Sequence, residues 1–273
     1  MRKAWLCWLA VWGWTVGVKA QEEITEANYW RQDSLLWQGY EKRMAELSEQ
    51  YGLMPEKKDS LREESKAALC RALAQNAALA LRFANTPGGL HRLYMVRNEV
   101  PKDTLRRTLK RLDAGLARSF YAGLIREYVD TKQVGEGRRL VTFPCVTADG
   151  RPFDWKTIRG KQVLLLYGGL DCMGVHGREE LRALYDATSR DELVIIVYQK
   201  VTATEYLREL KERFADPYVY VTDGKGEASP MCIRYGAQAT PTCFLTDRKH
   251  RIRLITTGFS FEQIRPFVNL IKQ

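Results

Sequence analysis

A short apolar run at residues 163–167 constrains the fold of this chain more than any other feature, because a cysteine-containing turn and a segment with helical spacing follow it. The run is too short for a helix and is typical of a buried strand. Beyond it, Leu181, Leu184 and Tyr185 fall at i, i+3 and i+4, the spacing of one helix face. The pattern predicts a strand that leads through residues 168–176 into a helix.

Cys172 lies in that turn, at the expected strand-to-helix junction. The first N–H groups of a helix have no intrahelical partner, and together with the helix dipole they favour a thiolate. Protonated His176 would add a favourable charge, whereas adjacent Asp171 opposes the thiolate unless its side chain caps the helix. We interpret Cys172 as a candidate reactive thiol. A dithiol redox site needs a second cysteine three residues on, and that position is Val175.

The second half of the chain alternates strand and helix patterns. Asp149-Gly150 between apolar runs predicts a hairpin over residues 141–155. Thr202 and Ser260 each begin a capping-box pattern at the start of a helix. Further strands are expected at residues 161–167, 193–198, 218–221, 240–247 and 252–256. This alternation predicts an α/β fold, with parallel strands in a sheet and helices on both of its faces.

The first half, residues 21–130, is rich in Ala, Leu, Glu, Lys and Arg and is expected to be helical. After Pro101, four leucines at i, i+4, i+7 and i+11 predict one continuous helix stripe: Leu105, Leu109, Leu112 and Leu116. Another helix is expected at about residues 60–83. No residues here have catalytic spacing, and Cys70, among alanines and leucines, is interpreted as a small core residue. We expect a packing or partner-binding module.

The N-terminal residues have the pattern of a signal peptide, with Arg2 and Lys3 before an apolar segment at residues 6–18. That segment is shorter than the roughly 20 residues needed to span a bilayer, so stable membrane insertion is not expected. Cleavage after Ala20 would leave 40 Lys and Arg against 33 Asp and Glu, a net charge of +7. We predict a periplasmic or otherwise exported protein that binds no nucleic acid and whose interspersed basic residues form solvated helix faces.

Glycines and charges without apolar periodicity at residues 131–140 divide the chain. We therefore expect a signal peptide at residues 1–20, a helical N-terminal domain at residues 21–136 and an α/β domain at residues 137–273.

The part from about residue 141 to residue 273 resembles a thioredoxin-like domain of the TlpA/ResA type. The features that carry the resemblance are Asp149-Gly150 followed by Gly160-Lys161 and an apolar strand, Cys172 at the start of the next helix, and Ala239-Thr240-Pro241-Thr242 followed by apolar residues and Asp247. The helical first half looks like the leader domain of some exported bacterial thioredoxin-like proteins. The resemblance implies a thioredoxin-like fold preceded by an all-α domain. It also implies a site of Cys172, Thr240 and Pro241, with a cis Thr240-Pro241 bond opposite the thiol.

The departures from the family fall at the same site. The family pattern is Trp-Cys-x-x-Cys, but Asp171 stands in place of Trp and Val175 in place of the second Cys. Gly174 replaces a proline often found in the motif, and an acidic residue expected shortly after it is displaced by Arg178 to Glu179. Cys172 and Pro241 can be carried over from the family, whereas the resolving thiol cannot.

The other cysteines leave two interpretations open. Without residues 1–20 the chain has five, an odd number that leaves at least one thiol free: Cys70, Cys145, Cys172, Cys232 and Cys243. Cys243 shares a strand face with Pro241, so it is either an unusual resolving thiol or a small buried residue of a central strand. Nothing in the spacing gives Cys145 or Cys232 a role.

Cys172 and His176, at i and i+4, share a helix face, which is a spacing that metal ligands use. Two ligands do not make a site, and the remaining histidines, His91 in the helical half and His250 in a turn, do not extend it. We expect neither a metal nor another cofactor.

Two functions follow from these observations. The first is an exported thioredoxin-like protein whose single motif cysteine, Cys172, exchanges with thiols or disulfides of partner proteins in the cell envelope, as a monothiol. The alternative is a non-catalytic interaction module that keeps the fold and has lost redox activity. The sequence leaves open whether the protein is a thiol-disulfide oxidoreductase.

Overall fold

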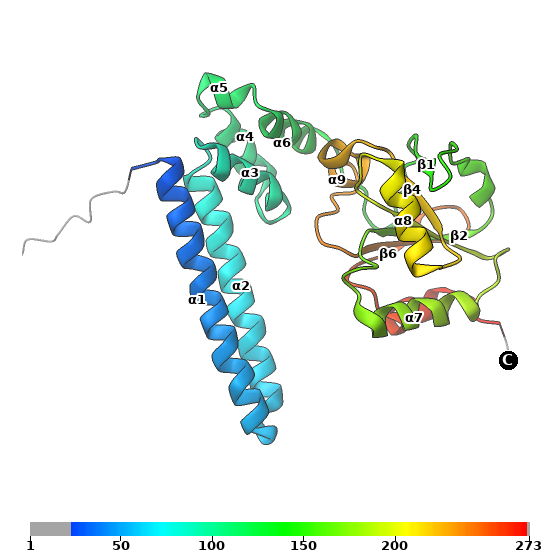
Figure 1. Cartoon of the computed structure of the whole chain (residues 1–273). Coiled ribbons are helices and arrows are strands. Elements are labelled where there is room, and N and C mark those ends of the chain that lie inside the picture. Colours follow the sequence, from blue (N-terminus) through cyan, green and yellow to red (C-terminus); the bar gives the residue numbers. More distant parts are fainter. Residues whose placement is uncertain (1–22, 272–273) are drawn as a thin grey trace, which may run out of the picture.

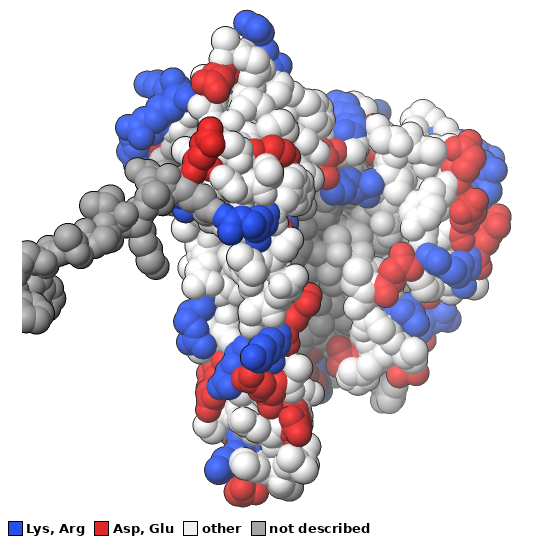
Figure 2. Space-filling view, turned by 60° about the vertical axis from the view of Figure 1, so that its left-hand side comes forward, with Lys and Arg blue, Asp and Glu red and all other residues white. Residues whose placement is uncertain are grey.

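The computed structural model describes residues 23–271, so the expected signal peptide lies outside the described residues. A helical N-terminal region precedes a mixed six-stranded sheet with helices (Figure 1). On the face shown in Figure 2, acidic and basic side chains are interspersed, as the sequence predicts. Within residues 23–271, no helix combines the length and apolar character needed to cross a bilayer.

The helical region is built on a long hairpin of two helices, α1 (Glu26–Leu53) and α2 (Lys58–Arg82), which projects away from the sheet (Figure 1). The helix expected at about residues 60–83 is thus confirmed as α2. The shorter helices gather at one end of the hairpin: α3 (Pro87–Met95), α4 (Lys102–Leu109), α5 (Ala114–Ala117) and α6 (Phe120–Asp130). Side-chain caps fix two helix starts, because Thr25 Oγ1 accepts the N–H of Asn28 and Thr86 Oγ1 accepts that of Gly89.

The continuous leucine helix expected after Pro101 is wrong. α4 ends at Leu109 and α5 begins only at Ala114. At Asp113 the backbone is extended, and its N–H donates to Asn85 Oδ1 at 2.8 Å, a partner outside the helix. The leucines still share one core, with Leu105 buried and the other three packed against the same cluster.

The sheet has the strand order β1-β4-β3-β2-β5-β6. Its strands are β1 (Val146–Thr147), β2 (Gln162–Tyr167), β3 (Leu193–Tyr198), β4 (Val219–Thr222), β5 (Thr242–Thr246) and β6 (Ile252–Thr257). The pairs β2–β3 and β3–β4 are parallel, whereas β1–β4, β2–β5 and β5–β6 are antiparallel. This is the arrangement of a thioredoxin-like sheet, so the predicted fold class is confirmed.

Helices cover both faces of the sheet, as predicted. One face forms a core with α7 (Gly174–Asp186), α8 (Thr204–Phe214) and α10 (Phe261–Ile264). The other packs against α9 (Pro230–Ile233) and residues 140–158. Every residue of β2 is buried, which is why residues 163–167 of this strand form an uninterrupted apolar run. The 3₁₀ helices are η1 (Pro55–Lys57), η2 (Arg97–Glu99), η3 (Trp155–Ile158), η4 (Gly226–Ala228) and η5 (Arg265–Phe267).

The local turn and cap predictions have mixed outcomes. The hairpin around Asp149-Gly150 is confirmed, because the Thr147 N–H donates to Arg151 O at 2.8 Å across the turn. The prediction of a capping box at Thr202 is wrong. The N-cap residue is Ala203, in an extended conformation, and α8 begins at Thr204 without a side-chain cap. Ser260 is the N-cap of α10, yet its side chain makes no capping hydrogen bond.

The helical region and the sheet contact each other through α9 and the chain around it. Ile233 of α9 is buried in the core cluster of the helical region. Tyr94 Oη donates to the carbonyl of Glu227 at 2.7 Å, and Gln133 Nε2 donates to that of Ile233 at 3.0 Å. The two parts therefore share both apolar and hydrogen-bonded contacts.

Candidate functional site

Cys172 lies in the turn between β2 and α7, one residue before the α7 N-cap, Met173. Its N–H donates to Gly169 O at 3.0 Å, and the residue is exposed. Gly169 has a positive φ of 97°, and a Cβ there would lie 2.5 Å from Pro241 Cβ. Only glycine permits this approach, so the turn brings Cys172 against the chain that precedes β5.

The structure brings the three predicted site residues together. The Thr240-Pro241 bond is cis, which confirms that prediction. Cys172 Sγ lies 3.6 Å from Thr240 Oγ1, and both residues are exposed, whereas Pro241 is buried. The site is an accessible thiol beside a hydroxyl and a proline, at the carboxyl end of β2.

The charged neighbours of Cys172 are paired with other groups. Asp171 Oδ1 accepts from Arg213 Nη2 of α8 at 2.7 Å, so Asp171 does not cap α7 and its charge is opposed by a cation. His176 Nε2 lies 3.5 Å from Glu180 Oε1 on the next turn of α7. The imidazole is therefore directed along its own helix toward Glu180.

Two arginines also lie at the site, and the sequence pattern predicts a contact there for neither of them. Arg213 approaches from α8, and Arg178 Nη1 of α7 donates to Leu170 O at 3.1 Å in the turn. The guanidinium of Arg178 also lies 5.3 Å from the centre of the Phe214 ring. Arg213 is 42 residues from Asp171, and no local spacing could have indicated that pair.

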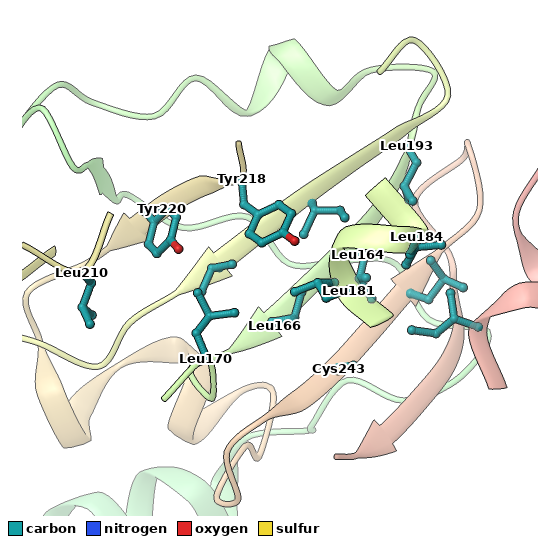
Figure 3. Packing of buried hydrophobic residues seen from close by; sticks show 14 of the residues in the cluster. Leu164, Leu166, Leu170, Leu181, Leu184, Leu193, Leu210, Tyr218, Tyr220 and Cys243 are labelled. Atoms are coloured by element: carbon teal, nitrogen blue, oxygen red, sulfur yellow. The ribbon is translucent and has the colours of Figure 1, made fainter. Parts of the chain in front are cut away.

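Cys243 is a buried residue of the core. It lies on β5 beside Leu166 of β2, within the apolar cluster that includes Leu170 and Leu181 (Figure 3). Its Sγ lies 3.6 Å from the carbonyl oxygen of Gly258, and burial raises the pKa of this thiol to about 12. These surroundings favour the core interpretation of Cys243 over the resolving thiol.

The remaining cysteines differ in exposure. Burial raises the pKa of Cys145 to about 12 and also raises that of Cys232, whose Sγ lies 3.4 Å from Tyr167 Oη. Cys70 is exposed, so its assignment to the core is wrong. It lines an apolar groove of about 510 Å³ between α2 and the chain at η2, together with Leu73 and Val100. All five cysteines in the described part of the chain are free thiols.

The histidines make contacts other than metal coordination. His91 stacks on Tyr121 with ring centres 4.4 Å apart, and His250 Nε2 lies 2.9 Å from the Ile158 carbonyl oxygen. Among residues 23–271, no three His, Cys, Asp or Glu side chains are grouped as metal ligands would be.

Comparison with known proteins finds neither a matching family model nor a matching curated protein. Solved structures resemble the second half of the chain. The thioredoxin domain of a thiol-disulfide oxidoreductase from Bacteroides vulgatus is 15% identical over 50% of this chain and 100% of that domain, with a TM-score of 0.42. A thiol-disulfide isomerase from Corynebacterium glutamicum is 20% identical over 48% of this chain and 92% of the isomerase chain, with a TM-score of 0.41. A thiol peroxidase from Chromobacterium violaceum is 17% identical over 50% of this chain and 86% of the peroxidase chain, with a TM-score of 0.41.

Proposed function

We propose that Cys172 takes part in thiol–disulfide exchange with a partner protein. The observation that carries this proposal is the contact of an exposed thiol with Thr240 beside the cis proline, with Sγ and Oγ1 3.6 Å apart. Thiol exchange needs an accessible sulfur, and its rate depends on the thiolate fraction and on access. The other four described cysteines are either buried or, like Cys70, lie on the helical hairpin.

The exchange step conserves sulfur oxidation states overall. The Cys172 thiolate attacks one sulfur of a partner disulfide, an S–S bond forms between Cys172 and that sulfur, and the other partner sulfur leaves as a thiolate. Val175 has no sulfur with which to displace the partner. Release therefore requires a second thiol, either from the partner itself or from a small thiol compound. A monothiol of this kind forms stable mixed disulfides and turns over slowly.

The second candidate is a non-catalytic interaction module. The observation that favours it is Val175, which is 64% exposed where a resolving cysteine would stand and offers an apolar contact instead. In this reading the surface around Cys172 binds a partner without forming a covalent bond.

Mixed-disulfide formation separates the two candidates. The full-length reduced protein is mixed with an aromatic disulfide that releases a coloured thiolate, and the adducts are located by peptide mass mapping. Cys70 is the internal reference, because it is exposed but lies mid-helix. The exchange proposal expects Cys172 to react at least about tenfold faster than Cys70. Equal rates at the two thiols contradict exchange and favour the interaction module.

We further propose that the protein is exported to the cell envelope, where its partners are protein thiols or disulfides. The support is the signal-peptide pattern at residues 1–20. We also propose a division into a helical domain at residues 21–136 and a thioredoxin-like domain at residues 137–273. The stretch between α6 and β1, which has neither helix nor strand, supports it. N-terminal sequencing of the purified protein should begin at or near Gln21, and retention of Met1 contradicts export by this signal.

A further inference from the structure

Arg97, the first residue of η2, is only 2% exposed although it carries a charge. Its guanidinium donates to the carbonyl oxygens of Tyr94 at 2.8 Å, Cys232 at 2.7 Å and Ala237 at 3.3 Å. The guanidinium carbon also lies 4.2 Å from the Tyr94 ring centre and 5.4 Å from that of Tyr128. One side chain of the helical region thus binds two points of the chain that leads to Thr240.

The neighbours of Arg97 hold the same stretch. Asn98 Nδ2 donates to the Gly236 carbonyl at 2.5 Å, and the side-chain amide of Gln238 donates to the Met95 carbonyl. With the bond from Arg97 to Ala237 included, the three consecutive residues 236–238 are each hydrogen-bonded to the helical region. These three have neither helix nor strand of their own, and they end two residues before the exposed threonine of the site.

The placement of Thr240 is sensitive to this support. Its hydroxyl lies 3.6 Å from Cys172 Sγ, and Pro241 packs on Gly169 with no room for a Cβ. A displacement of about 1 Å in a reacting geometry can cost about a hundredfold in rate. From the sheet side, Thr242 Oγ1 donates to Ala239 O at 2.6 Å and the Gly258 N–H donates to Pro241 O at 2.8 Å. The bonds from the helical region hold the other end of the stretch, residues 236–238.

The choice of arginine fits positioning better than space filling. Burying a charge opposes folding, and an apolar residue of similar size often stabilises a core as well or better. The planar guanidinium offers five donors in a fixed geometry, so it can reach several carbonyl oxygens at once. Methionine offers no donor, and lysine offers its donors from a single nitrogen.

We propose that Arg97 is a positioning residue for the thiol site, through which the helical region fixes the stretch before Thr240 and so the hydroxyl beside Cys172. The helical region is then part of the site and not a separate module. This inference rests on the proposed exchange at Cys172 for its consequence in rate, whereas its consequence for backbone order is independent of that proposal.

The test compares full-length wild type with Arg97→Met and Arg97→Lys by two measurements. Hydrogen exchange is measured at residues 236–240 and in β2 and β3. The rate of adduct formation with the aromatic disulfide is measured at Cys172 itself, because Cys70 lines a groove with Glu99 of η2. For Arg97→Met we expect exchange at residues 236–240 to be about tenfold faster while the strands are unchanged. The rate of adduct formation at Cys172 should fall by up to a few-fold, the size expected for loss of the Thr240 hydroxyl, and Arg97→Lys should restore part of both.

A matched control is Leu47→Ala, which removes a side chain that is 1% exposed in the hairpin. It should weaken the helical hairpin that also carries Cys70, and leave the rate of adduct formation at Cys172 itself unchanged. Equal effects of Leu47→Ala and Arg97→Met on the rate at Cys172, or unchanged exchange at residues 236–240 in Arg97→Met, overturn the inference.

Two further outcomes are separable. If Arg97→Met does not fold, Asn98→Ala at an exposed position should still speed exchange at residues 236–240 by a few-fold, and unchanged exchange there overturns the inference. If wild-type Cys172 reacts no faster than Cys70, the proposed function fails, while hydrogen exchange at residues 236–240 still decides whether Arg97 orders this stretch.

Discussion

The turn that carries Cys172 and the strand that carries Cys243 are neighbours with opposite properties. Cys172 follows β2 and is exposed, whereas Cys243 on β5 is paired in register with Leu166 of β2 and buried. Both thiols are free. Cys172 is part of one motif on which the thioredoxin resemblance rests, and Cys243 directly follows another. Their difference in surroundings shows that closeness to the motif does not make a thiol reactive. Access and the groups beside the sulfur do.

The largest effect expected from this comparison is the loss of mixed disulfides with partner proteins in Cys172→Ser, which leaves only adducts at the exposed Cys70. Serine keeps the shape of the side chain but cannot form an S–S bond. Cys243→Ser should leave the adducts intact, because burial keeps that thiol from reagents. Mass spectrometry of the trapped complexes measures both. If Cys243→Ser alone eliminates exchange in the native protein, Cys243 is the resolving thiol and the monothiol mechanism is wrong.

The next effect concerns turnover. Val175→Cys restores a thiol three residues after Cys172, near enough in a helix start to attack a mixed disulfide. We expect turnover with a model protein disulfide and a small dithiol reductant to rise about tenfold or more. Val175→Ser is the matched control, since it is polar and small but has no sulfur. An unchanged rate in Val175→Cys, with no adducts at Cys172, favours the interaction module.

The buried side of the comparison has a pH signature. A cysteine thiol ionises near pH 8.5 in an unfolded chain, whereas burial raises the pKa of Cys243 to about 12 in the folded protein. Its contribution to stability is therefore fully present below about pH 8.5 and is lost as pH rises toward 12. The slope for this one group is at most about 1.4 kcal/mol per pH unit. Urea unfolding from pH 7 to 10 should show a smaller decline for Cys243→Ala than for wild type, and equal slopes contradict this.

The smallest effect is expected at the hydroxyl beside the exposed thiol. Thr240→Val keeps the branched shape and removes Oγ1, which lies 3.6 Å from Cys172 Sγ. We expect adduct formation at Cys172 to slow by a few-fold, the size of one weak hydrogen bond. The stopped-flow rate with the aromatic disulfide measures it. A rate equal to that of wild type shows that the Thr240 hydroxyl does not affect the reactivity of Cys172.

The sequence was sufficient for the sheet because its signals are local. The run at residues 193–198 coincides with β3, since a strand buried on both sides is apolar throughout. Cys172, Thr240 and Pro241 lie together as expected, because the motifs that contain them are placed at the ends of neighbouring strands. The order of strands and turns along the sequence thus predicts both the sheet and the position of the site.

The errors lie where distant contacts decide the outcome. The break between α4 and α5 involves Asn85, which is 28 residues from Asp113 and invisible to periodicity. Cys70 was misplaced because α2 has apolar residues on its outer side as well, with Leu69 41% and Leu73 38% exposed. Which side is covered depends on α1. The ion pair of Asp171 with Arg213 was out of reach for the same reason.

The bonds of η2 to the stretch before Thr240 also bear on the order in which the molecule is assembled. They join residues 135 to 140 positions apart, so Arg97 leaves the ribosome long before its partner carbonyls are made. Contacts this distant in sequence are among the last to form. We expect the thiol site to be completed only when nearly the whole chain is in place. Pulsed labelling of Cys172 during refolding, with strand formation followed in parallel, should show the site maturing after the sheet.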